Sequence, residues 1–504
     1  MSEPDRPRQQ RDPSSGEADG RPAPPGRGPS AADPATDGDP PSRKESHPST
    51  NGDQRSTNGD DPATGGDATD TTRRDFLKIL GISGAGAATA ACTPPETTDK
   101  LLPQLVTEKD VEPGENTVYS TVLARGGPEP LGLHAWVRDG RTINLEGNPE
   151  FPTNGERISA LGRSALQDLY DPDRFRGPRR RSGGELAEAS WDDAMAGVSQ
   201  ALGGDAVLLT GPVSGTRERF LAEWAEATGV EHLTWEPLHH EVQREANRRV
   251  HGRAEIPDYV LERADRIVSF GADFLGTWLA PVELAGRFAR AREVDEGRYA
   301  ELTFVGPRVS LTGTNADEWL GARSGTEGLV ALAAARLVAE ARGGADARGL
   351  RGLLAPFAPD RVAERSGVPA GKIRSLAESL AAAERPVALP PGPEGRGPAA
   401  TDAHVAVALL NRVAGAVGET VRFGGGPLRG RPSTAAALSE LADRMRAGEV
   451  TTLMVADADP AYALPASVGF REAMENATVV SLDSHPTDTA AAADWVLPVH
   501  HELE

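Results

Sequence analysis

Residues 264–273 read ADRIVSFGAD, a short apolar run that ends in glycine and aspartate. Similar runs occur elsewhere in the chain: DAVLLTG at 205–211, TLMVADAD at 452–459 and TVVSLD at 478–483. The segments between such runs predict helices, and the clearest of these are 191–202, 216–228, 326–341 and 402–415. Short apolar strands that alternate with helices are typical of parallel sheets covered on both faces. The sequence therefore predicts α/β domains built on doubly wound parallel sheets.

The residues after the predicted strands are candidates for ligand binding. Gly271 and Asp273 follow one strand, and Asp459 and Asp483 follow two others. Ligands of doubly wound sheets bind beyond the carboxyl ends of strands, where an aspartate can accept hydrogen bonds from a guanine or a ribose. Neither the Gly-Lys-Ser/Thr phosphate loop nor the Gly-x-Gly-x-x-Gly dinucleotide loop occurs in the sequence. Glycine is also common in plain turns, so a nucleotide-like ligand and simple turns both remain open.

The composition excludes several classes of protein. The chain has 504 residues, 54 Lys and Arg against 75 Asp and Glu, a net charge of −21 and a single cysteine. Such an acidic chain lacks the basic face that nucleic acid requires. With 38% hydrophobic residues it cannot form a bundle of several membrane spans. One cysteine cannot hold an iron–sulfur cluster or a four-cysteine zinc site, so we expect no such cluster on this chain.

Residues 1–70 predict a disordered acidic tail. They contain no Val, Leu, Ile, Phe, Trp or Tyr, and they carry 14 acidic and 8 basic side chains. A segment of this kind cannot bury enough apolar surface to offset the entropy lost on ordering. Most of the net charge of −21 therefore belongs to the rest of the chain, where we interpret it as a solubilising surface.

Residues 71–92 have the pattern of a twin-arginine export signal. Arg73 and Arg74 precede Asp-Phe-Leu-Lys, and a run of small, weakly apolar residues follows as far as Cys92. That run is too short and too rich in Gly and Ala for a membrane span. The Thr-Ala-Ala before Cys92 is similar to a lipoprotein cleavage site, with a free buried cysteine as the alternative. We expect an exported protein on the periplasmic or other extracytoplasmic face of the cytoplasmic membrane, held there by a lipid anchor.

Several motifs keep their order over about residues 118–504. They are VRDGRTINLEGNPEFP at 137–152, LYDPDR at 169–174, SWDDA at 190–194, ADRIVSFGAD at 264–273 and DTAAAADWVLP at 488–498. Together they resemble the molybdopterin oxidoreductases of the bis-guanine-dinucleotide type. The resemblance implies a small β-rich domain at 116–190, one α/β domain from 191–235 plus 385–504, and a second from 236–384. It also implies that the family's C-terminal β-barrel domain is missing here.

The departures from that family concern the metal. Many of its members open with a four-cysteine cluster motif, which this chain does not have. The family's metal ligand lies in the segment that corresponds to 235–247, and no thiolate occurs there. His239 and Glu241 are weak candidates for metal ligands, and a solvated turn at a helix start is the reading that we favour. The resemblance thus implies molybdopterin guanine dinucleotide as a cofactor, without a recognisable protein ligand for the metal.

A narrower resemblance is to the B subunit of alternative complex III, the quinol:electron-acceptor oxidoreductase. It is carried by the polar tail ahead of the export signal, the lone cysteine, and the segments 111–114, 236–237, 273–276, 309–317 and 500–504. That family's molybdopterin-like domain is thought to hold no molybdenum cofactor, and its iron–sulfur clusters lie in a ferredoxin-like domain that we expect to be missing here.

This resemblance implies a cofactor-free scaffold in a quinol-oxidising, membrane-associated electron-transfer complex. The expected partners are iron–sulfur, haem-bearing and membrane quinol-binding subunits, and no residue of the chain is assigned a catalytic role. The alternative is a genuine catalytic subunit that depends on molybdopterin guanine dinucleotide. In that case Gly271, Asp273, Asp459 and Asp483 would contact the cofactor.

Overall fold

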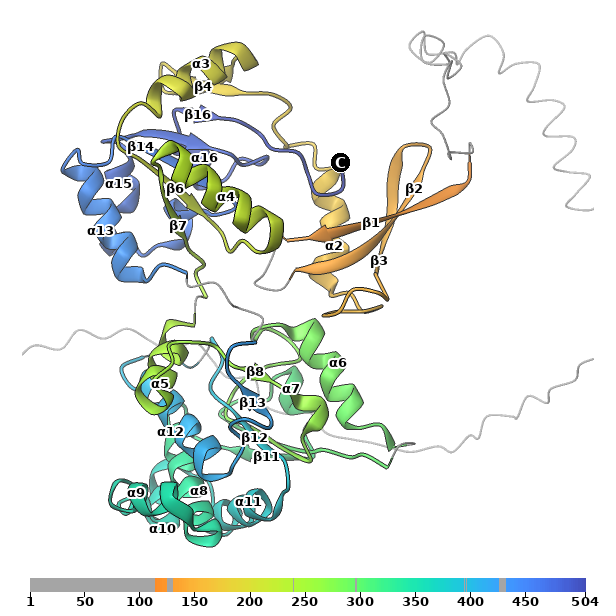
Figure 1. Ribbon diagram of the computed structural model, residues 1–504, viewed down its shortest axis with the longest axis vertical. Coiled ribbons are helices and arrows are strands. Elements are labelled where there is room, and N and C mark those ends of the chain that lie inside the picture. Colours follow the sequence, from red (N-terminus) through yellow and green to blue (C-terminus); the bar gives the residue numbers. More distant parts are fainter. Residues whose placement is uncertain are drawn as a thin grey trace, which may run out of the picture. The chain divides into compact units, whose positions relative to one another are not determined.

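The computed structural model describes residues 114–124, 130–238, 240–294, 297–393, 395, 397–425 and 432–504 (Figure 1). The predicted tail at 1–70 and the predicted signal at 71–92, with Arg73, Arg74 and Cys92, lie outside the described residues. His239 does so as well. Within the described ranges, no helix has both the length and the apolar character needed to cross a bilayer.

A three-stranded antiparallel sheet opens the described chain. Its strands, in spatial order, are β1 (Asn116–Leu123), β2 (Leu131–Arg138) and β3 (Arg141–Gly147). The turn between β2 and β3 has Asp139 at φ 49° and Gly140 at φ 74°, the left-handed pair that a two-residue hairpin needs. Asp-Gly is one of the residue pairs that favour this type of hairpin turn. Leu133 and Leu145 are fully buried beneath the sheet, together with Ala165 of helix α2 (Ala160–Leu169).

A seven-stranded sheet follows, in the order β5-β4-β16-β15-β14-β6-β7. Its strands are β4 (Arg179–Ser182), β5 (Glu185–Glu188), β6 (Ala206–Thr210), β7 (Glu231–Thr234), β14 (Thr452–Ala456), β15 (Thr478–Ser481) and β16 (Trp495–Val496). The run from β16 to β7 is parallel, and the β4–β5 hairpin joins β16 in antiparallel fashion.

Helices cover both faces of the seven-stranded sheet. Along β14, Leu453 and Val455 point into one apolar cluster, whereas Met454 between them points into another. The first cluster is completed by α13 (Ala435–Arg446), α15 (Phe470–Met474) and α16 (Asp488–Ala492), and the second by α3 (Trp191–Ala201) and α4 (Gly215–Thr228). Figure 1 shows α13 and α15 on the opposite side of the sheet from α4. The short helices α14 (Pro460–Ala463) and η3 (Ala466–Val468) complete this part.

The second parallel sheet has four strands in the order β11-β10-β9-β12. They are β9 (Arg266–Ser269), β10 (Glu301–Gly306), β11 (Glu318–Gly321) and β12 (Pro386–Leu389). A two-stranded ladder of β8 (Asp258–Tyr259) and β13 (Val421–Arg422) lies in the same part of the chain. The helices here are α5 (Glu241–His251), η1 (Leu261–Arg263), α6 (Pro281–Ala291), α7 (Leu311–Thr314), α8 (Glu327–Arg342), α9 (Gly344–Leu354), α10 (Pro359–Ser366), α11 (Ala370–Ala382) and α12 (Ala400–Val413). The predicted doubly wound α/β architecture is therefore confirmed.

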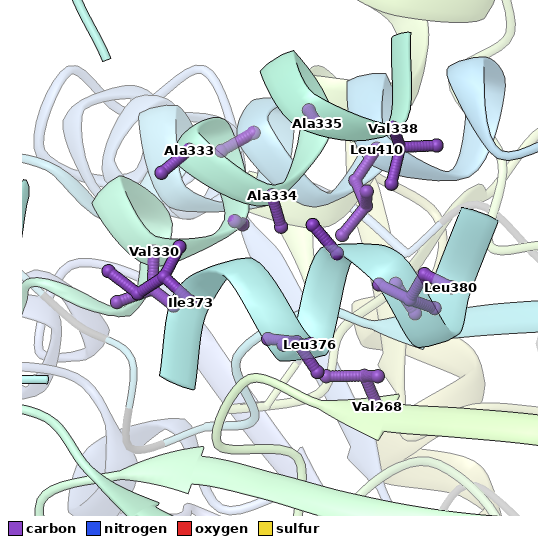
Figure 2. Packing of buried hydrophobic residues seen from close by; sticks show 14 of the residues in the cluster. Val268, Val330, Ala333, Ala334, Ala335, Val338, Ile373, Leu376, Leu380 and Leu410 are labelled. Atoms are coloured by element: carbon purple, nitrogen blue, oxygen red, sulfur yellow. The ribbon is translucent and has the colours of Figure 1, made fainter. Parts of the chain in front are cut away.

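Helix α8 is the centre of the larger apolar cluster. Figure 2 shows its side chains meeting those of α11 and α12 above Val268 of β9. Its buried positions are mostly alanine, which lets the neighbouring helix axes come close. At Gly328 even one methyl group would not fit, because an ideal Cβ would lie 2.7 Å from Cα of Ala403 on α12. The close crossing of α8 and α12 therefore depends on that glycine.

The sheet pairing differs from the predicted domain division. Strand β12 pairs with β9, and α12 packs on α8, so residues 386–425 lie with 241–321 and not with 191–235. The β4–β5 hairpin extends the seven-stranded sheet, although the prediction had placed it in the β-rich domain at 116–190. The apolar pattern of β12 reveals that the strand is buried, but it does not reveal which sheet takes it. The polar strands β4 and β5 give no burial signal, and their sheet is set by the pairing of β4 with β16.

We expect Leu376→Ala to lower the free energy of unfolding by about 2–5 kcal/mol, because it opens a cavity in this packed cluster. Leu376 of α11 is only 1% exposed. The matched control is Leu353→Ala, since Leu353 is 56% exposed and its loss should change stability by less than about 0.5 kcal/mol. Urea unfolding followed by circular dichroism measures both, and equal effects would contradict the described packing.

Candidate functional site

The carboxyl ends of β6, β14 and β15 lie side by side at one edge of the seven-stranded sheet. The loops after β6 and β14 are in direct contact, because the amide of Gly211 donates to the carbonyl oxygen of Ala456 at 3.0 Å. An ideal Cβ on Gly211 would lie 2.4 Å from the carbonyl oxygen of Asp457, so this position needs glycine. Asp457 has a left-handed backbone with φ 52°, and its carboxylate pairs with Arg217 of α4 at 2.5 Å.

Asp459 fastens the loop after β14 to the start of α16. Its Oδ1 accepts hydrogen bonds from the amide of Thr489 at 2.9 Å and from Oγ1 of the same residue at 2.6 Å. Its Oδ2 accepts one from the amide of Asp488 at 3.2 Å. Both carboxylate oxygens are therefore already engaged by the chain itself.

Asp483 stands at the end of β15, also with partners from its own loop. Its Oδ2 accepts hydrogen bonds from Oγ of Ser481 at 2.9 Å and from Oγ1 of Thr487 at 3.2 Å. The pKa of Asp483 is raised to about 6, chiefly by burial and also by repulsion from Asp457 and Asp459, against the lowering effect of the two hydroxyl donors. The edge thus carries three carboxyl groups, one of which changes protonation in the mildly acidic range.

Gly271 and Asp273 occupy the corresponding place after β9 in the four-stranded sheet. Gly271 has φ 99°, a left-handed turn that favours glycine. Asp273 is 8% exposed, and its Oδ1 accepts a hydrogen bond from the amide of Thr312 at 2.8 Å. Its Oδ2 lies directly over Gly276, where an ideal Cβ would be 2.3 Å away. Asp273 therefore joins the loop after β9 to the short helix α7 that follows β10.

The segment corresponding to the family's metal ligand forms a turn into α5. Trp235 is 3% exposed, His240 is the residue before the helix with φ 50°, and Glu241 is its first residue. In the part of the chain that the structure describes, no three His, Cys, Asp or Glu side chains gather as a metal site. None of the described residues is assigned a step in metal chemistry.

The structure separates the predicted site residues into two sets. Asp459 and Asp483 meet at one sheet edge, whereas Gly271 and Asp273 belong to the other sheet. Sequence reasoning did not select Asp457 and Arg217. Asp457 lies two residues before Asp459, after the same predicted strand, and could have been chosen with it. Arg217 is 240 positions away in the sequence from its partner, and only the parallel pairing of β6 with β14 reveals it.

We expect Asp483→Asn to remove a pH dependence of stability. A carboxyl with a pKa of about 6 when folded and about 4 when unfolded binds more protons in the folded protein, so stability falls as pH rises from about 4 to about 6. The amide does not titrate, so the variant should gain stability relative to the wild type over that interval and keep the gain above pH 6. Urea unfolding at pH 4, 5, 6 and 7 measures this, and a constant difference between the two proteins would contradict it.

We expect Asp273→Ala to lower the free energy of unfolding by about 1–3 kcal/mol, because the buried amide of Thr312 loses its acceptor. Asp273→Asn should retain most of the stability, since an amide oxygen can accept the same hydrogen bond. Thermal unfolding of the two variants beside the wild type tests this. An equal loss of stability in both variants would contradict this prediction. It would show that the negative charge of Asp273 stabilises the fold, and not its ability to accept the hydrogen bond.

No protein-family model matches the chain. Among curated proteins, the menaquinone reductase molybdopterin-binding-like subunit of Nitratidesulfovibrio vulgaris is 29% identical over 418 residues, which cover 78% of this chain and 59% of that protein. The arsenate respiratory reductase molybdopterin-containing subunit of Shewanella sp. (strain ANA-3) is 25% identical over 40% of this chain and 25% of its own length. The thiosulfate reductase molybdopterin-containing subunit of Salmonella typhimurium is 26% identical over 40% of this chain and 27% of its own length. The chain thus spans about three fifths of the first relative and about a quarter of the other two.

Among solved structures, acetylene hydratase from Pelobacter acetylenicus is similar with a TM-score of 0.61 and 18% identity, over 76% of this chain and 63% of that one. At this identity the likeness establishes the fold alone, and it agrees with the two parallel sheets described above. The matched relatives, the ordered motifs and the fold agree: the chain is similar to subunits of the molybdopterin oxidoreductase family.

Proposed function

We propose that the chain is the molybdopterin-like subunit of an exported, membrane-associated electron-transfer complex that oxidises quinol. Within that complex it acts as a scaffold and holds no molybdenum cofactor of its own. It positions iron–sulfur and haem-bearing subunits next to a membrane subunit that binds quinol. Arg73 and Arg74 direct its export, and a lipid on Cys92 anchors it to the membrane.

The observation that carries this proposal is that the carboxylates at the strand ends accept hydrogen bonds from the protein's own loops. Asp273 accepts a hydrogen bond from Thr312, and Asp459 accepts hydrogen bonds from Asp488 and Thr489. These bonds connect the loops after the strands to the first residues of α7 and α16. In this chain the strand-end carboxylates form hydrogen bonds with the chain's own loops, and the fold is retained. A chain of this kind is suited to act as a scaffold for other subunits.

The relatives and the surface give further support. The Nitratidesulfovibrio relative is named as a molybdopterin-binding-like subunit of a menaquinone reductase, and this supports a link to a quinone for the present chain. Helix α4 buries none of its side chains fully, and Phe220 on it is 61% exposed. On α3, Trp191 and Met195 are 50% and 55% exposed. Large apolar side chains in contact with solvent are typical of surfaces that pack against another protein.

The alternative function is that of a genuine catalytic subunit with molybdopterin guanine dinucleotide. Two relatives are named as molybdopterin-containing subunits, which favours this alternative. The carboxyl groups of Asp457, Asp459 and Asp483 stand at a sheet edge where such folds bind nucleotides. Under this alternative, a ligand that is not a side chain of the described residues would complete the coordination of the metal.

The two functions differ in metal content. The full-length protein, purified from its native membrane with all that accompanies it, should contain molybdenum and tungsten far below one atom per chain, and no pterin fluorescence. Haem-bearing and iron–sulfur subunits should copurify. A molybdopterin enzyme isolated from the same cells is the control for cofactor supply. Molybdenum and pterin at one per chain would overturn the scaffold proposal and establish the catalytic alternative.

A further inference from the structure

A groove between α8 and α9 concentrates positive charge in an acidic protein. Its volume is about 420 Å³, and three arginines line it: Arg336 on α8, and Arg348 and Arg351 on α9. The rest of its lining consists of Glu340, Ala339, Gly343, Gly344, Ala347, Leu354 and Ala355. A volume of this size is typical of sites for small molecules. None of these residues belongs to the strand-end loops, so the groove is separate from the candidate site.

The three arginines differ in how they are held. Nε of Arg336 donates to Oε1 of Glu340 at 3.0 Å, and its Nη1 donates to the carbonyl oxygen of Ala355 at 2.9 Å. The Arg336 side chain is therefore held in the groove lining by two partners, and its charge is balanced by that of Glu340. By contrast, Arg348 and Arg351 form no side-chain hydrogen bond or ion pair with the described residues.

Arg348 and Arg351 are three positions apart on α9, which places them on the same face of the helix. Two like charges at this spacing repel each other, and the chain as a whole has a net charge of −21. The acidic side chains so abundant elsewhere do not pair with either of them within the described residues. An anion in the groove would relieve this repulsion and give both guanidinium groups a partner.

We propose that this groove binds a phosphate group, carried either by a small soluble molecule or by an anionic lipid headgroup. The planar fork of a guanidinium group matches the oxygens of a phosphate, and two or three such forks surround it well. The floor of Ala339, Ala347 and Leu354 accepts an apolar part next to the phosphate. The proposal does not depend on the function of the strand-end loops, because it requires neither a pterin nor a partner subunit.

Binding is tested on the full-length protein with three probes: inorganic pyrophosphate by titration calorimetry, and vesicles of phosphatidylglycerol or of phosphatidylcholine by sedimentation. For the vesicle arm the protein is made with Cys92→Ser, so that a lipid on that residue does not bind the vesicles itself. We expect pyrophosphate or phosphatidylglycerol to bind and phosphatidylcholine not to bind.

The double variant Arg348→Ala, Arg351→Ala should weaken that binding by about tenfold or more, since it removes two charged hydrogen-bond donors. Alanine is favourable at exposed helix positions, so the variant should fold normally, and circular dichroism checks this.

The matched control is Arg290→Ala, which removes an exposed arginine from the last turn of α6, outside the groove. It should leave the affinity unchanged. Binding of pyrophosphate identifies a soluble phosphate compound as the source, and binding of phosphatidylglycerol vesicles alone identifies a lipid. The proposal is overturned if neither probe binds, or if Arg290→Ala weakens binding as much as the double variant, because the attraction would then come from overall charge and not from the groove.

Discussion

The structure depends on strands that are buried on both faces. Every residue of β6, β9, β12 and β14 is buried, and alternate side chains enter opposite apolar clusters. Such strands cannot carry polar side chains in number along their length, because a buried polar group without a partner is costly. The polar residues of these sheets are therefore concentrated where the strands end, and the parallel arrangement brings those ends to a common edge.

The carboxyl groups at these edges are engaged by the protein's own loops. Asp459 and Asp273 each accept a hydrogen bond from a second segment of the chain. These bonds hold the loops at the strand ends in place. The pKa of Asp483 is raised, chiefly by burial, and its carboxyl is held between hydroxyl donors and neighbouring carboxyl groups. The family fold can thus be retained by hydrogen bonds within the protein, whether or not a large cofactor spans the same edges.

The sequence predicts local features well and distant pairings poorly. The Asp139–Gly140 turn, the strand at 452–456 and the Ala-rich helix near 326–341 follow from local chemistry, and the structure has all three. The assignment of β12 to a sheet does not follow, since its four residues would suit the interior of either sheet. The ion pair of Arg217 and Asp457 was missed for a related reason, because the two residues meet only when β6 lies beside β14. Local propensity is contained in a few neighbouring residues, whereas register and partner choice are decided by the packing of the whole domain.

The connectivity of the seven-stranded sheet has a consequence for how the protein is made. Strand β6 pairs with β7 and with β14, and the segment that forms the four-stranded sheet lies between β7 and β14 in the sequence. A ribosome therefore completes that inner segment while β6 still lacks one of its neighbours. Contacts between residues far apart in sequence form slowly, and an unpaired apolar strand is prone to aggregate until it is covered. The inner segment can fold as a unit first, and β14, β15 and β16 then complete the outer sheet.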